Sequence, residues 1–272
     1  MTKISAYPAQ EPLSPAALVY HNRVIELGTC VAEGQCVAYG ADPYQQLLIY
    51  PASKPTGAVL AFIHGGGWTN GYKEWMAFMA PAVNGVGVTF VSIGYRLAPL
   101  HLFPVGLEDC ADGLVLARKL TDSAALFVGG HSAGGHYAAL LAVRDDWWRR
   151  RGLASNPLHG CLPLSGVYCF GQGSGLSTRP RFLGGGDAER SASPVEQITD
   201  GTPFLLAHGD RDFPHLIAQA EAMTQALQAA GNPVERVVLT DCDHFAASYQ
   251  AGQATGSWLA RAASFMKRYQ SA

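Results

Sequence analysis

Gly130-His131-Ser132-Ala133-Gly134-Gly135 is the stretch that decides the fold. The apolar run 125–129 before it is typical of a buried strand, and residues 133–143 after it are typical of a helix. A serine flanked by glycines where a strand turns sharply into a helix is the arrangement that exposes a nucleophile. The glycines fit because a side chain at either flanking position would collide with neighbouring backbone. We therefore predict that Ser132 is a nucleophile.

Short β-rich runs alternate with helix-length amphipathic segments along the rest of the chain. This alternation predicts an α/β fold with a mostly parallel central sheet and helices on both faces. Several runs are nearly continuous in apolar residues, as expected of strands buried on both faces. The predicted strands are residues 46–50, 58–64, 86–93, 125–129, 158–164, 203–208 and 234–239. Apolar residues recur at helical spacing over residues 107–117, 216–227 and 258–269.

The length of 272 residues and the hydrophobic content of 48% fit one large domain. We predict a single domain over residues 1–272. Two segments do not follow the alternation, namely an N-terminal extension at 1–45 and an insertion at 168–198. Long irregular insertions in compact domains are often lids or binding loops, and this one has few helical signals. We therefore expect a minimal lid.

Composition excludes several other classes of protein. A net charge of -2 without a concentrated basic surface argues against nucleic-acid binding. No apolar run approaches the roughly 20 residues that cross a bilayer, and the N-terminus lacks the hydrophobic stretch of a signal peptide. We expect a cytoplasmic protein with no membrane partner, and the sequence leaves a homodimer open. The six cysteines have no metal-like spacing, so neither a metal nor an organic cofactor is expected.

A second glycine-rich stretch, His64-Gly65-Gly66-Gly67-Trp68, directly follows a predicted buried strand. Attack on a carbonyl carbon creates an oxyanion that needs preorganised donors, and glycines let backbone N–H groups approach it closely. We predict that the N–H groups of Gly66, Gly67 and Ala133 form this oxyanion hole. His64 is expected to orient the loop.

A general base and an acid complete such a site, in the chain order nucleophile, acid, histidine. His244, which follows the predicted strand 234–239, is the histidine that this order favours as the general base. The predicted strand 203–208 opens into a loop that contains both Asp210 and Asp212. Either carboxylate could orient the imidazole. Spacing alone gives a modest preference for Asp212, with Asp210 as a turn residue.

These motifs resemble those of the esterase and lipase group related to hormone-sensitive lipase, and especially its kynurenine formamidase-like (arylformamidase) branch. The resemblance extends over nearly the whole chain. It rests on HGGGW at 64–68, YRLAP at 95–99, FP at 103–104, ED at 108–109, GHSAGG at 130–135, HGDRD at 208–212 and DHF at 243–245. The resemblance implies the α/β-hydrolase fold, with Asp212 as the triad acid and His244 as the triad histidine.

We therefore predict a serine hydrolase that cleaves a small carboxylic ester through a Ser132-His244-Asp212 triad and an acyl-enzyme. An arylformamidase or related amide or carbamate hydrolase stays open, because ester and formamide cleavage use the same groups. A non-catalytic ligand receptor on a hydrolase scaffold is the third possibility.

The substrate pocket is expected to be lined by aromatic residues close to the motifs. These residues are Trp68, Tyr72, Tyr168, Phe170 and Phe245. We expect an aromatic or short-acyl substrate, an ester or a formamide, because a minimal lid gives long chains little apolar surface.

Overall fold

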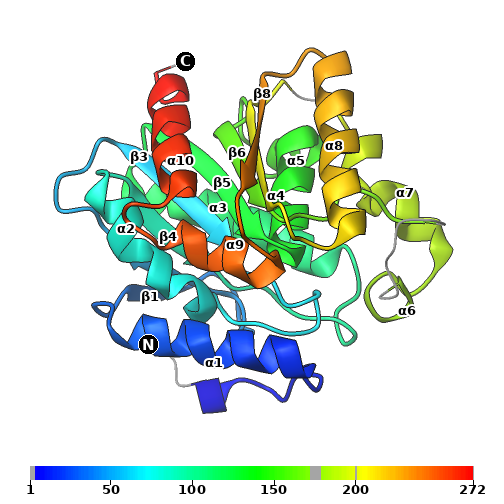
Figure 1. Ribbon diagram of the computed structural model, residues 1–272, viewed down its shortest axis with the longest axis horizontal. Coiled ribbons are helices and arrows are strands. Elements are labelled where there is room, and N and C mark those ends of the chain that lie inside the picture. Colours follow the sequence, from blue (N-terminus) through cyan, green and yellow to red (C-terminus); the bar gives the residue numbers. More distant parts are fainter. Residues whose placement is uncertain (1–3, 172–178, 200, 272) are drawn as a thin grey trace.

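The computed structural model describes residues 4–171, 179–199 and 201–271. It is built on an eight-stranded sheet with the strand order β1-β2-β4-β3-β5-β6-β7-β8 (Figure 1). The pairs β1–β2 and β2–β4 are antiparallel, and the remaining neighbours are parallel. The strands are β1 (Gln35–Ala38), β2 (Gln46–Tyr50), β3 (Ala58–Ile63), β4 (Thr89–Ile93), β5 (Ala125–His131), β6 (Leu158–Leu164), β7 (Phe204–Gly209) and β8 (Val234–Leu239).

Helices surround this sheet. The α-helices are α1 (Pro15–Thr29), α2 (Ala80–Gly85), α3 (Val105–Thr121), α4 (Ala133–Val143), α5 (Asp146–Arg150), α6 (Arg179–Phe182), α7 (Glu189–Ala192), α8 (Pro214–Ala229), α9 (His244–Ala251) and α10 (Ser257–Tyr269). Short 3₁₀ helices lie at Ile4–Ala6, Lys73–Met79, Gly186–Ala188 and Pro194–Glu196. Within the described ranges, no helix is both long enough and apolar enough to cross a bilayer.

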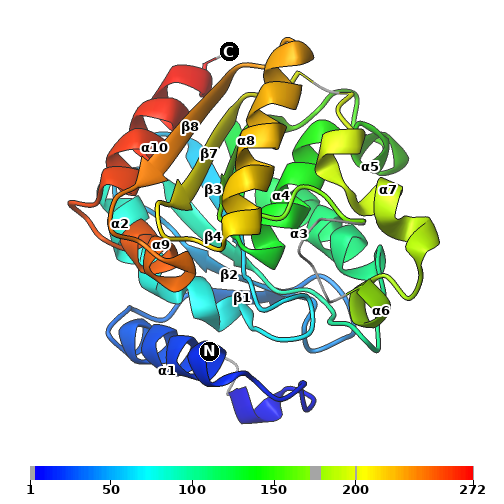
Figure 2. The same ribbon diagram turned by 45° about the vertical axis from the view of Figure 1, so that its right-hand side comes forward.

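Strand β3 divides its side chains between two cores. All of its residues are buried. The odd-numbered ones belong to the core that contains α3, α4 and α8, and the even-numbered ones to the core that contains α1, α2 and α10. Figure 2 shows α8 and α10 on opposite faces of the sheet. Because successive strand side chains point to opposite faces, an unbroken apolar run is what a strand covered on both sides requires. The predicted fold class is confirmed.

The ends of some predicted strands are wrong by a few residues. The run 86–93 forms a strand only from Thr89, because Gly87 adopts a positive φ of 81° in the preceding turn. The strand predicted at 125–129 continues through His131, so that it leads directly into Ser132. These differences arise because strand ends depend on turn geometry and pairing, which the apolar pattern does not record.

The N-terminal extension contains two elements that we did not predict, α1 and β1. Helix α1 begins after Ser14, whose side chain accepts a hydrogen bond from the N–H of Ala17 (3.3 Å), and Pro15 occupies its first position. A serine cap followed by proline is a recognised start signal that could have revealed this helix. The insertion, where described, holds only α6, α7 and 3₁₀ turns. Residues 172–178 of the predicted insertion lie outside the described residues.

Candidate active site

Ser132 lies on the tight turn between β5 and α4. Its backbone angles are φ 55° and ψ −118°, a region that residues other than glycine rarely occupy. The N–H of Ser132 donates to the carbonyl oxygen of Leu164 at the end of β6 (3.0 Å). Such strain persists where surrounding structure determines the backbone, and it recurs at functional sites. The turn holds the Ser132 side chain at the carboxyl edge of the sheet.

The glycines around Ser132 are required by close backbone contacts. A Cβ atom at Gly130 would lie 2.3 Å from the carbonyl carbon of Gly134. A Cβ atom at Gly134 would lie 2.0 Å from the carbonyl oxygen of Ile63, at the end of β3. Neither contact can be relieved by turning a side chain, because both partners are backbone atoms.

We expect Gly134→Ala to lower the free energy of unfolding by about 2 kcal/mol or more, because β3 and α4 would have to separate to admit the methyl group. Gly85→Ala is the matched control, since a Cβ atom at Gly85 meets nothing within 4 Å. It should change the free energy by no more than about 0.5 kcal/mol. Urea denaturation compares the two variants. Equal stabilities would contradict the packing that we infer for this turn.

His244 makes two hydrogen bonds that join Ser132 to a carboxylate. Its Nε2 lies 3.0 Å from the hydroxyl oxygen of Ser132, and its Nδ1 lies 2.8 Å from Oδ1 of Asp212. With Nδ1–H donating to the carboxylate, Nε2 can accept the hydroxyl proton. Asp212 comes from the turn between β7 and α8, and His244 begins α9 after β8. Parallel strands thus bring residues distant in sequence to one edge of the sheet.

The Asp212 carboxyl is buried in this arrangement. Burial raises its pKa, but the hydrogen bond and the charge of His244 act in the opposite direction and outweigh it, which lowers the pKa to about 2. The carboxyl is therefore ionised at neutral pH. An ionised carboxylate fixes the tautomer of the imidazole and stabilises the imidazolium that forms when it takes a proton.

The neighbouring Asp210 makes a different contact. Its Oδ1 accepts a hydrogen bond from the N–H of Cys242 (3.2 Å), in the loop that precedes His244. A Cβ atom at Gly209 would lie 2.0 Å from the carbonyl oxygen of Cys242, so the two loops pack backbone against backbone. Asp210 thus holds the loop of His244, while Asp212 contacts the imidazole itself.

The backbone of His244 is held from two sides. Asp243 caps α9 by accepting hydrogen bonds from the N–H groups of Phe245 (3.0 Å) and Ala246 (2.8 Å). On the other side, Nε2 of the buried His131 lies 2.9 Å from the carbonyl oxygen of His244. Burial, together with the nearby charge of His244, lowers the pKa of His131 to about 3. A neutral His131 can donate this bond through Nε2–H.

The glycine loop after β3 lies directly beside Ser132. A Cβ atom at Gly65 would lie 3.2 Å from Cβ of Ser132. Gly66 and Gly67 have positive φ values of 111° and 60°. Within the described part of the chain their N–H groups donate no backbone hydrogen bond. The N–H of Ala133, the first residue of α4, has no acceptor within its helix. Donors from two elements are therefore available near Ser132.

His64 holds the start of this loop. It is fully buried, its Nδ1 lies 2.7 Å from the carbonyl oxygen of Gly65, and its ring stacks on Tyr95 with centroids 4.3 Å apart. Burial lowers the pKa of His64 to about 4. A neutral, hydrogen-bonded His64 fits the orienting role that we predicted.

A cavity of about 320 Å³ opens onto Ser132 and His244. Gly66, Gly67 and His131 line it together with Ser132. The N-terminal extension contributes a wall that we did not predict, made by Pro12, Leu13, Ser14, Ala17 and Tyr20. Arg181 of α6, Phe213 and Trp75 also line the cavity.

Among the five aromatic residues predicted to line the pocket, Phe245 lines this cavity and the other four do not. Trp68 donates from Nε1 to Nδ1 of His136 (3.0 Å) and, like Phe170, packs against Phe182. Tyr72 packs against Tyr7 and Trp75, and Tyr168 is buried in the core. The prediction was wrong for these four because closeness to a motif in sequence does not fix the direction of a side chain. Trp68 itself is buried and has a positive φ of 64°.

Sequence reasoning missed three aromatic residues of the cavity, Tyr20, Trp75 and Phe213, of which Tyr20 comes from the N-terminal extension. Its ring stacks on Phe245 with centroids 5.0 Å apart and meets Trp75 edge to face at 5.5 Å. Its hydroxyl lies 2.9 Å from the hydroxyl oxygen of Ser248 in α9. Helix α1 is therefore packed against the element that begins with His244.

Comparisons with known proteins agree with this fold. A family model described as alpha/beta hydrolase fold matches residues 60–179. Esterase LipC of Mycobacterium tuberculosis is 29% identical over 221 residues, which are 71% of this chain and 54% of LipC. Kynurenine formamidase of Danio rerio is 24% identical over 218 residues, 77% of this chain and 73% of that enzyme. The chain spans about half the length of LipC.

A solved arylesterase structure superposes with a TM-score of 0.73 at 20% identity, covering 95% of this chain and 100% of that one. At this identity the likeness concerns the fold. The sheet, the matched segment and the relatives together show that the chain has the α/β-hydrolase fold and is similar to an esterase and a kynurenine formamidase.

Proposed function

We propose that the protein is a serine hydrolase that cleaves small carboxylic esters through a covalent acyl-enzyme. The observation that carries the proposal is the line of hydrogen bonds from Ser132 through His244 to Asp212, in a cavity that Gly66 and Gly67 also line. Nucleophile, base, acid and oxyanion donors are the set that acyl transfer requires.

The mechanism follows from these positions. His244 Nε2 takes the proton of the Ser132 hydroxyl as its oxygen attacks the ester carbonyl. The N–H groups of Gly66, Gly67 and Ala133 stabilise the oxyanion. The tetrahedral intermediate collapses, and the leaving alcohol takes the proton from His244. A water molecule then attacks the acyl-enzyme, giving its proton to His244, and Ser132 regains a proton as the carboxylic acid leaves.

An arylformamidase is the second candidate. The cavity walls formed by Tyr20, Trp75, Phe213 and Phe245 favour a flat aromatic group next to the reacting carbonyl. The similarity to a kynurenine formamidase supports the same direction. A non-catalytic receptor is less well supported, because a receptor needs neither the triad nor unpaired amides beside Ser132.

We also propose that the protein acts in the cytoplasm on a small-molecule substrate. None of its six cysteines, all of which lie within the described residues, forms a disulfide bond. The absence of disulfide bonds is the rule for proteins of reducing compartments.

The test compares initial rates on aryl acetates and on N-formyl aromatic amines, together with labelling by a fluorophosphonate. We expect covalent labelling and a higher kcat/KM for the acetates. Faster cleavage of the formamides would replace the first candidate with the second. Absence of both labelling and turnover would overturn the assignment as a hydrolase.

A further inference from the structure

The turn at residues 66–70, which carries the proposed oxyanion donors, has an unusual backbone. Gly66, Gly67 and Trp68 have positive φ values of 111°, 60° and 64° in succession. Glycine adopts such angles readily, whereas they are unfavourable for a residue with a bulky side chain. A buried tryptophan keeps this conformation where the surrounding structure holds it. The contacts of Trp68 therefore decide the shape of this glycine turn.

The indole of Trp68 has a polar partner and a stacking partner. Its Nε1 donates to Nδ1 of His136 (3.0 Å), and the two rings meet edge to face with centroids 5.3 Å apart. The indole also stacks on Phe182 of α6 with centroids 4.2 Å apart. The stack permits the indole to slide in its own plane, whereas the directional hydrogen bond to His136 does not.

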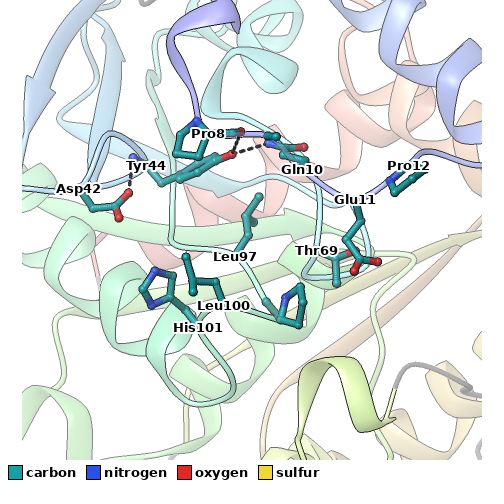
Figure 3. Close-up of a pocket in the computed structure, with 13 residues that line it drawn as sticks. Pro8, Gln10, Glu11, Pro12, Asp42, Tyr44, Thr69, Leu97, Leu100 and His101 are labelled. Carbon is teal, nitrogen blue, oxygen red and sulfur yellow. Dashed lines mark hydrogen bonds between the residues drawn. The ribbon is translucent and has the colours of Figure 1, made fainter.

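The backbone around Trp68 is anchored by two other segments. The carbonyl oxygen of Trp68 accepts from the N–H of Ala98 (2.9 Å), in the loop at residues 97–101 that lines a separate cavity (Figure 3). Gln10 makes a pair of hydrogen bonds to Gly71, donating to its carbonyl oxygen (2.8 Å) and accepting from its N–H (2.9 Å). The indole is the part of the turn that depends on a side-chain acceptor.

The glycine turn determines where the N–H of Gly67 points. The carbonyl oxygen of Gly66 accepts from the N–H groups of Thr69 (3.3 Å) and Asn70 (3.0 Å), which closes the turn. Because a trans peptide is planar, the N–H of Gly67 points in the direction opposite to that carbonyl. It therefore points out of the turn, and both glycines line the active-site cavity. A change in the turn would redirect this donor.

His136 belongs to the helix that follows Ser132. It lies in α4, and its N–H donates to the carbonyl oxygen of Ser132 (3.0 Å). Its side chain is fully buried, and Nε2 lies 2.6 Å from the carbonyl oxygen of Ala192 at the end of α7. One helix thus fixes the nucleophile and the acceptor of the Trp68 indole relative to each other.

The two contacts of His136 are compatible with one protonation state. An indole N–H only donates, so Nδ1 carries no proton, and a carbonyl oxygen only accepts, so Nε2 carries one. Burial lowers the pKa of His136 to about 3, so this neutral form persists through the neutral range. His136 therefore offers Trp68 a fixed acceptor.

We propose that His136 is a positioning residue for the hydrolase reaction, which acts through the indole of Trp68. It holds the glycine turn so that the N–H groups of Gly66 and Gly67 face the oxyanion. The inference rests on the proposed hydrolase function. Neither His136 nor Trp68 is among the described residues that line the active-site cavity, so the effect reaches the substrate through the turn. It is felt as negative charge develops in the transition state.

Two substitutions at position 136 separate the contacts of the imidazole. His136→Asn places an acceptor oxygen near the position of Nδ1 but does not extend to the carbonyl of Ala192. His136→Gln reaches that carbonyl with its amide nitrogen but leaves the indole N–H without its acceptor. Each variant loses the ring and one buried hydrogen bond, so the midpoints of urea denaturation should shift by similar amounts.

The two variants should differ in kcat for p-nitrophenyl acetate. His136→Gln should lower kcat and kcat/KM about 30-fold with KM within about twofold, because displaced donors weaken an interaction made in the transition state. In His136→Asn, which restores the acceptor, kcat should stay within about threefold of the wild type. Equal losses in the two variants, a larger loss in His136→Asn, or an unchanged kcat in His136→Gln would overturn the proposal.

Trp68→Phe tests the same contact from the other partner and replaces His136→Gln should that variant not fold. Phenylalanine keeps a ring to stack on Phe182 but has no N–H to donate, so kcat should fall by a similar factor with KM unchanged. In the double variant the two losses should not add, because both substitutions remove the same hydrogen bond. Additive losses, or a wild-type kcat in Trp68→Phe, would contradict an action through the indole.

His159→Gln is the matched control. His159 lies near the amino end of β6, at the edge of the sheet opposite Ser132, and its Nδ1 accepts from the N–H of Leu126 (3.3 Å). Its kcat should stay within about twofold of the wild type. A wild type that neither cleaves aryl acetates nor takes the fluorophosphonate label would remove the hydrolase function itself. An active, labelled wild type with unchanged kcat in the position-136 variants would remove the role of His136 alone.

Discussion

Ser132→Ala is expected to lower kcat for aryl acetates by about 10⁵- to 10⁶-fold, with no loss of stability. Without the hydroxyl, His244 has no nucleophile to activate, and only the oxyanion donors and substrate binding remain to accelerate attack by water. The strained turn does not depend on the hydroxyl, since it is set by the N–H of Ser132 and by the glycines around it. Stopped-flow and long-term assays together cover this range of rates.

Fluorophosphonate labelling followed by mass spectrometry gives a second readout for Ser132→Ala. The label should disappear from this variant and persist in Ser264→Ala, which changes an exposed serine of α10. Labelling of Ser132→Ala at another serine, with activity retained, would show that the nucleophile had been assigned wrongly.

Asp212→Asn is expected to lower kcat by about 10⁴-fold. The amide has nearly the shape of the carboxylate, but it no longer favours the imidazole tautomer with Nδ1–H and no longer stabilises the imidazolium. The low pKa of Asp212 means that the wild-type carboxylate is charged throughout the neutral range, so the variant loses a full charge next to His244.

Asp210→Asn is the matched control for this change. Asparagine keeps an oxygen that can accept the hydrogen bond from the N–H of Cys242, so the loop of His244 should stay in place. We expect a loss of less than tenfold in kcat. Should Asp210→Asn prove more damaging than Asp212→Asn, the acid of the triad would be Asp210.

The turn at Ser132 could be predicted from sequence because its chemistry is local. Gly130 and Gly134 have no room for a side chain, and the strand and helix around them are strongly patterned. The choice between Asp210 and Asp212 could not be made from spacing alone, since both follow the same strand. It depends on how the loop after β7 packs against Cys242, which is a contact between distant parts of the chain.

The cavity walls were the least predictable part of the site. Tyr20 contacts Phe245 because α1 packs against α9, although the two helices lie far apart in the sequence. Gln10 belongs to an irregular segment with no apolar period, and its paired bonds to Gly71 connect residues far apart in the chain. Trp68 was expected in the cavity because it follows the glycine loop, but it donates a hydrogen bond to His136 and does not line the cavity. Long-range hydrogen bonds of this kind leave no periodic trace in a sequence.

The paired hydrogen bonds between Gln10 and Gly71 fix the N-terminal segment next to the glycine loop. The reacting groups come from turns after β5, β7 and β8, whereas residues that precede β1 line the active-site cavity. Substrate choice could therefore diverge by exchange of that leading peptide alone, with the chemical machinery inherited unchanged.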